Sequence, residues 1–74
     1  MNHYYICTGV DLTKKMIMTR KYPDAEAIAG VLECFDPDVA KSAKDIDFEV
    51  QSRASHGGAL IIKGKNYLWS IFYV

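Results

Sequence analysis

The sequence predicts a single small α+β domain in which an antiparallel sheet of four to five strands packs against one main helix, in the order ββα(α)βββ. Three observations support this prediction. Segments rich in aromatic and β-branched residues precede Pro23, a helical pattern follows it, and further strand-like segments end the chain. With 74 residues, 50% of them hydrophobic, the chain has enough apolar side chains for one domain with its own core, spanning residues 1–74.

The first predicted unit is an antiparallel hairpin. Residues 3–8 are mainly aromatic and β-branched, which favours a strand. Residues 9–14 contain Gly9 and Asp11 and predict a turn, and residues 15–21 predict the returning strand. Such a short connection joins antiparallel neighbours.

The main helix is predicted over residues 23–35. Pro23 suits the first helical turn, and Asp24 there interacts favourably with the positive end of the helix dipole. At 100° per residue one face of the helix collects four large apolar side chains, which we expect to contact the core: Ile28, Val31, Leu32 and Phe35. The Asp36-Pro37-Asp38 sequence then predicts a new helix start, with a short second helix over residues 37–44.

Three strands are predicted after this point. Residues 45–52 alternate between polar and apolar types, which is typical of a half-buried strand with Ile46, Phe48 and Val50 pointing inward. Residues 59–63 predict a fourth strand, residues 64–66 a tight turn, and residues 67–74 the terminal strand.

The terminal strand is apolar on both faces. Leu68, Ser70, Phe72 and Val74 alternate with Tyr67, Trp69, Ile71 and Tyr73. One helix covers only one face of a sheet, so the other face needs either the 37–44 segment or another molecule. We expect another molecule, with Trp69, Ile71 and Tyr73 as partner-binding residues. That molecule is a different protein or a second copy, giving a homodimer.

The charges are balanced in number but segregated along the chain. Residues 24–49 contain eight acidic side chains and two lysines, and the remaining residues contain seven basic side chains and one acid. This segregation predicts a second binding surface, complementary to a basic partner, formed by Glu26, Glu33, Asp45, Asp47 and Glu49. A solvated acidic face without a partner is the alternative.

No pattern in the sequence indicates catalysis, a metal site or a cofactor. Cys7 and Cys34 lie among apolar residues, which raises a thiol pKa and predicts two buried, unreactive cysteines without a disulfide. His3 and His56 lack the spacing of metal ligands, and the glycines of residues 57–58 and 64 fit turns better than phosphate loops. The chain also lacks a signal-peptide pattern and an apolar run near the ~20 residues of a membrane span. We therefore expect a soluble cytoplasmic protein that is not an enzyme.

The sequence thus favours a non-enzymatic protein-binding module. In size, in its single α+β domain and in its lack of catalytic residues, the chain resembles the small inhibitory proteins that phages and other mobile elements encode. That resemblance implies action in a host cytoplasm by occlusion of a surface on a larger complex. The alternative is single-stranded nucleic-acid binding, if Tyr67, Trp69 and Tyr73 share an open sheet face with Tyr4 or Tyr5.

Overall fold

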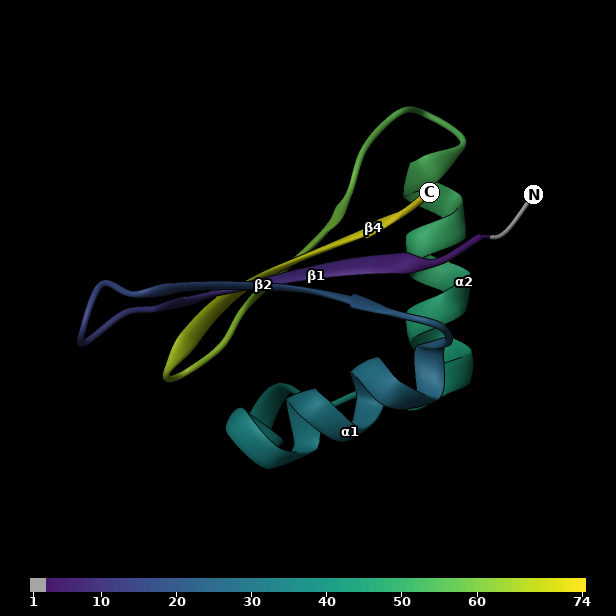
Figure 1. Cartoon of the computed structure of the whole chain (residues 1–74). Coiled ribbons are helices and arrows are strands. Elements are labelled where there is room, and N and C mark those ends of the chain that lie inside the picture. Colours follow the sequence, from purple (N-terminus) through teal and green to yellow (C-terminus); the bar gives the residue numbers. More distant parts are fainter. Residues whose placement is uncertain (1–2) are drawn as a thin grey trace.

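The computed structural model describes residues 3–74 and consists of a four-stranded sheet and two α-helices (Figure 1). The elements follow one another in the order β1 (Tyr5–Asp11), β2 (Ile17–Tyr22), α1 (Ala25–Phe35), the 3₁₀ turn η1 (Pro37–Val39), α2 (Ala43–Ala54), β3 (Leu60–Lys63) and β4 (Tyr67–Tyr73). The α+β class, the single antiparallel sheet and the predicted first helix are confirmed.

All neighbouring strands are antiparallel, in the spatial order β2-β1-β4-β3. The two central strands therefore come from opposite ends of the chain, and β1 pairs with β4 along its whole length, from Tyr5 opposite Tyr73 to Asp11 opposite Tyr67. The sheet consists of two hairpins joined through these central strands. Each hairpin leaves one strand, β2 or β3, at an edge of the sheet.

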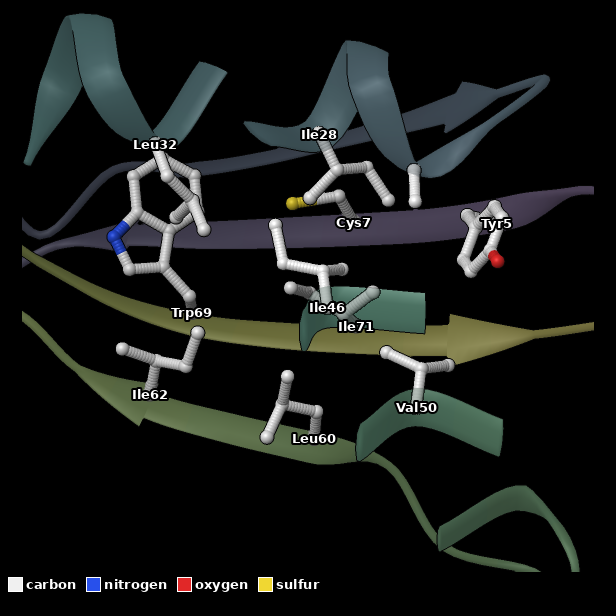
Figure 2. Close-up of a cluster of buried hydrophobic side chains, with 11 residues drawn as sticks. Tyr5, Cys7, Ile28, Leu32, Ile46, Val50, Leu60, Ile62, Trp69 and Ile71 are labelled. Carbon is white, nitrogen blue, oxygen red and sulfur yellow. The ribbon is translucent and has the colours of Figure 1, made fainter. Parts of the chain in front are cut away.

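Both helices pack on the same face of the sheet. α1 runs along the sheet beneath β1 and β2, whereas α2 crosses the strands near the C-terminus and contacts β3 and β4 (Figure 1). The core lies between these two layers, where Ile28 and Leu32 of α1 and Ile46 and Val50 of α2 meet the side chains of β1, β3 and β4 (Figure 2). The closely packed layers make one continuous hydrophobic core.

The segment predicted as a strand over residues 45–52 is α2, and that prediction was wrong. Ile46 and Val50 are buried, but Phe48 between them is 73% exposed. In a helix, residues four apart share a face while the residue midway between them points away. The Ser42 hydroxyl accepts a hydrogen bond from the Asp45 backbone N–H and caps the helix start.

Smaller differences concern the ends of elements. The predicted second helix over residues 37–44 is reduced to the single turn η1, and the helix begins only after Ser42. Phe35, expected in the core, is exposed; its ring lies edge-on to Tyr67 and tilted against Trp69, at centroid distances of 5.7 and 6.4 Å. It ends the helix, beyond the part of α1 that lies over the sheet centre.

Asp36 joins the end of α1 to the β3–β4 turn. Its carboxylate accepts hydrogen bonds from the backbone N–H groups of Asn66 (2.9 Å) and Tyr67 (3.0 Å) and from the indole Nε1 of Trp69 (2.9 Å). Its own N–H donates to the Leu32 carbonyl at 2.7 Å, closing the helix. One buried carboxylate therefore fixes the helical layer to the terminal hairpin.

Candidate interaction surfaces

The terminal strand places its two sets of side chains in very different surroundings. Trp69 and Ile71 are 2% and 0% exposed, because they face the helices within the core. Tyr73 is half-buried on the same side. The expectation that Trp69 and Ile71 contact a partner was therefore wrong: the two helices together cover the face on which these side chains lie.

The opposite face of the sheet, here called the open face, is not covered by any element in residues 3–74. The strand register places these side chains on it: Tyr4, Ile6, Thr8, Val10, Ile17, Thr19, Lys21, Ile61, Lys63, Leu68, Ser70, Phe72 and Val74. Ile17 and Ile61 at the two edges are 68% and 59% exposed, and Leu68, Phe72 and Val74 are exposed as well. The open face is thus an apolar surface with a row of hydroxyls across its middle. Its exposed apolar side chains are neighbours on one face, whereas single scattered apolar side chains are common on any protein surface.

Charge is segregated between the two layers. The acidic residues 24–49 form α1, η1 and most of α2, while most of the basic residues lie on the strands and turns of the sheet layer. Lys21 and Lys63 lie on the two edge strands of the open face, and Lys21 Nζ lies 4.6 Å from the centre of the Tyr4 ring. The segregation seen along the sequence is therefore also a segregation in space, with a basic sheet layer and an acidic helical layer.

The structure brings together only part of the predicted acidic surface. Glu26 and Asp47 line one open hollow of about 440 Å³ with Tyr5 and Tyr73, between the start of α1 and α2. The Tyr5 hydroxyl donates a hydrogen bond to Asp47 Oδ1. Burial, and then this hydrogen bond, raise the pKa of Tyr5 to about 12, so the phenol stays protonated at neutral pH.

The remaining predicted acidic residues lie elsewhere. Asp45 and Glu49 line a separate hollow on another side of α2, and Glu49 Oε2 is 3.2 Å from Lys41 Nζ. Glu33 lies near the opposite end of α1 from Glu26. The five acidic residues share the helical layer but do not form one site.

A groove beside the edge strand β2 was not predicted from the sequence. It has a volume of about 340 Å³ and is lined by Met18, Arg20 and Tyr22 of β2 and by Val31 and Phe35 of α1, with Trp69 at its floor. The helical layer does not fill the space beside this edge strand, and residues 17–21 of β2 are all exposed. The strand order, which places β2 at an edge, was the missing information.

The two cysteines are free, but only Cys7 is buried. Burial raises the pKa of the Cys7 thiol to about 11, which keeps it protonated and unreactive at neutral pH. Cys34 is exposed, contrary to expectation, because it lies off the helical face that carries Ile28 and Leu32. His56 follows α2, where its Nδ1 lies 3.2 Å from both Ser55 Oγ and the Ser52 carbonyl oxygen.

Within residues 3–74, no group of three or more His, Cys, Asp or Glu side chains is placed to hold a metal ion. None of the helices described has the length and hydropathy needed to cross a membrane. Comparisons of the chain with protein-family models, with curated proteins and with solved structures find no match. The surfaces themselves are therefore the basis for assigning a function.

Proposed function

We propose that the protein is a non-enzymatic binding module that recognises another protein through the open face of its sheet. The observation that carries this proposal is the uncovered apolar face, on which Ile17, Ile61, Leu68 and Phe72 are all exposed. Burying such side chains contributes about 25 cal/mol per Å² of apolar surface, which favours association. A small module of this kind acts by occupying a surface of a larger partner.

The charges at the rim specify the chemistry of the partner. Lys21 and Lys63 lie at the two edges of the open face, and Lys65 lies in the β3–β4 turn. The complementary surface is an apolar patch bordered by carboxylates, since opposite charges at a rim accelerate association and orient the two proteins. A basic partner fits the acidic helical layer instead, and binding through that layer is the competing arrangement.

A matched set of surface variants tests which layer binds. Phe72→Ser and Leu68→Ser change the open face, whereas Phe48→Ser removes an exposed phenylalanine from α2. Each chain is immobilised and the proteins it retains are compared. We expect the native chain and the Phe48→Ser variant to retain the same proteins, and either open-face variant to lose them. Equal retention by all four chains would disprove binding through this face.

Two further measurements separate other occupants of the face. Light scattering that gives twice the mass of 8.3 kDa, reverting to the monomer with Phe72→Ser, would identify a homodimer instead. Titration with a single-stranded oligonucleotide tests the second candidate function, in which Tyr4 and Phe72 stack on bases beside Lys21. The structure leaves that candidate fewer aromatic groups, because Trp69 and Tyr73 face the helices.

A further inference from the structure

The outer edge of β2 carries free backbone hydrogen-bonding groups. Asp11 N–H donates to the Met16 carbonyl, and the antiparallel register continues this pairing through Met18, Arg20 and Tyr22. In an antiparallel ladder, the intervening residues direct their N–H and C=O groups to the other side. Ile17, Thr19 and Lys21 therefore point their backbone groups away from β1, where no strand in residues 3–74 pairs with them.

Apart from the basic side chains Arg20 and Lys21, this edge lacks the features that usually prevent a further strand from joining. β2 has six residues, contains no proline and is not covered by a helix along its outer side. An exposed edge of this length is a template for strand addition. The other edge strand, β3, has only four residues and lies beside a hollow that η1 and α2 also line.

The groove between β2 and α1 lies where alternate side chains of an added strand would point. Its walls are formed by Met18 and Tyr22 on one side and by Val31 and Phe35 on the other. Its volume of about 340 Å³ is within the range of sites that enclose a bulky apolar group. Backbone pairing at an edge combined with pockets for alternate side chains is a known mode of peptide recognition.

The charge around β2 identifies the kind of segment that fits. Between Leu12 and Tyr22 the chain carries four basic side chains and no acidic one: Lys14, Lys15, Arg20 and Lys21. Arg20 lies at the groove itself. A second copy of the chain would bring two basic strands together, so like charges disfavour self-association through this edge.

We infer that β2 is a strand-addition site for an extended, acidic segment of a partner protein, which pairs with the backbone of Ile17, Thr19 and Lys21 and inserts a large apolar side chain between β2 and α1. The site uses the edge of the sheet and its helix-covered side. It borders the open face, to which Ile17, Thr19 and Lys21 direct their side chains, but it does not depend on the function proposed for that face.

Thr19 allows a test that changes one backbone donor. Thr19→Pro removes an outward N–H without removing a bond to β1, and proline is tolerated on edge strands. Thr19→Val is the matched control, because it keeps the N–H and loses only the hydroxyl that lies 3.2 Å from Thr8 Oγ1. Circular dichroism and thermal melting establish that both variants are folded.

The probe is a fluorescein-labelled, acetylated octapeptide in which Asp or Glu alternates with Leu, Phe or Ile. We expect anisotropy to show saturable binding, and Trp69, the single tryptophan at the groove floor, to change its emission. Thr19→Pro should weaken the affinity about tenfold, the effect of one main-chain hydrogen bond, whereas Thr19→Val should leave it unchanged. Replacing the acidic residues of the peptide by lysine should abolish binding.

Equal affinity of the native chain and Thr19→Pro for the peptide, or no binding at all, would overturn the inference. If Thr19→Pro does not fold, N-methylation of the peptide residues that face β2 removes the same hydrogen bonds with the native chain intact, and undiminished binding would then refute the site. A dimer dissociated by Thr19→Pro would show that a second copy occupies the edge instead. Phe72→Ser should keep full affinity for the peptide, so this test and that of the open face fail independently.

Discussion

At the residue scale, the Asp36 carboxylate is a buried charged group that links the two layers of the fold. It is 1% exposed and accepts three hydrogen bonds from the β4 side of the molecule. Burial alone would raise its pKa, but the N–H groups of Asn66, Trp69 and Tyr67 outweigh burial and lower the pKa below the usual value. The charged form is therefore the one that the fold stabilises.

Asp36→Asn should lower the free energy of unfolding by roughly 2 kcal/mol at pH 7, because charge-assisted hydrogen bonds become neutral and one acceptor becomes a donor. Because the folded-state pKa is depressed, the stabilisation by Asp36 is present above its unfolded pKa, near 3.8, and is lost as pH falls through the folded pKa. Urea unfolding between pH 7 and pH 2 measures both effects. The variant should lose less stability on acidification than the native chain.

Asp38→Asn provides the control, since Asp38 is exposed in the same turn η1. It should leave the stability at pH 7 within about 0.5 kcal/mol of the native value. An equal loss in both variants would mean that the hydrogen bonds of Asp36 are not the cause.

Gly64 and Gly30 differ in the space around them, so we expect alanine to have opposite effects on stability at the two positions. A Cβ at Gly64 would overlap the Asp36 carboxylate and lie 2.9 Å from the Tyr67 carbonyl oxygen, whereas a Cβ at Gly30 would meet nothing within 4 Å. Gly64→Ala should therefore destabilise the fold by more than about 1 kcal/mol. Gly30→Ala, inside α1, should stabilise it by about 0.5–1 kcal/mol. Thermal melting of the pair checks the contrast, and a gain in stability for Gly64→Ala would contradict it.

At the scale of elements, α2 shows how a polar and apolar alternation can occur in a helix. Ile46, Phe48 and Val50 alternate as in a strand, but Ala43, Ile46, Val50 and Ala54 are also spaced by three or four residues. Ser42, with Asp45 three residues later, matches a helix N-terminal signature. This capping signal is the information in the sequence that the strand prediction for residues 45–52 did not use.

Alanine substitutions in α2 distinguish the two interpretations. Ile46→Ala should cost about 3 kcal/mol, because it leaves a cavity between the layers, whereas Phe48→Ala should change stability by less than about 0.5 kcal/mol. Both side chains would be buried in a strand, so similar losses in urea unfolding would contradict the helix. Ser42→Ala should cost about 1 kcal/mol through loss of the cap.

At the scale of the whole molecule, the core between sheet and helices is shared by nearly every element. Cys7 lies on a central strand within that core, together with side chains of α1, α2, β3 and β4. Its side chain is buried but also lines the groove between β2 and α1, so access to the thiol requires at least that α1 move away from β2. Cys34, by contrast, is exposed in the folded state.

A thiol reagent should therefore modify one cysteine quickly and the other only when α1 opens away from the sheet. Under native conditions at pH 8 we expect one equivalent to react at once, at Cys34, and the second at a rate that increases with urea. Cys34→Ser should abolish the fast phase and leave the slow one. Rapid reaction of Cys7 in the folded Cys34→Ser variant would contradict the shared core.

The same layering organises the surfaces at the molecular scale. One layer is basic and leaves its outer face apolar and uncovered, and the other is acidic and covers the inner face. When helices cover a single side of a sheet, the other face is exposed, and an edge strand that they do not cover is exposed as well. The open face and the β2 edge are consequences of this architecture, and they give the chain two separate surfaces for partners.

Local sequence patterns were sufficient for the hairpins, for α1 and for the fold class. Turn residues such as Gly9 and Asp11, and the Pro23-Asp24 helix start, act within a few residues of chain, so their effect is visible in the sequence. The two-sided apolar character of β4 predicted that both of its faces are covered; the helices cover one, and a partner on the other stays a prediction. Charge segregation was likewise visible before its arrangement in space was known.

Only the tertiary structure decided which face was covered. Trp69 and Ile71 are as apolar as Leu68 and Phe72, so composition could not distinguish the set beneath the helices from the set left open. That choice depends on the packing of α1 and α2 against one side of the sheet, and the edge position of β2 depends on β1 pairing with β4. These are contacts between distant parts of the chain, and local patterns carry little information about them.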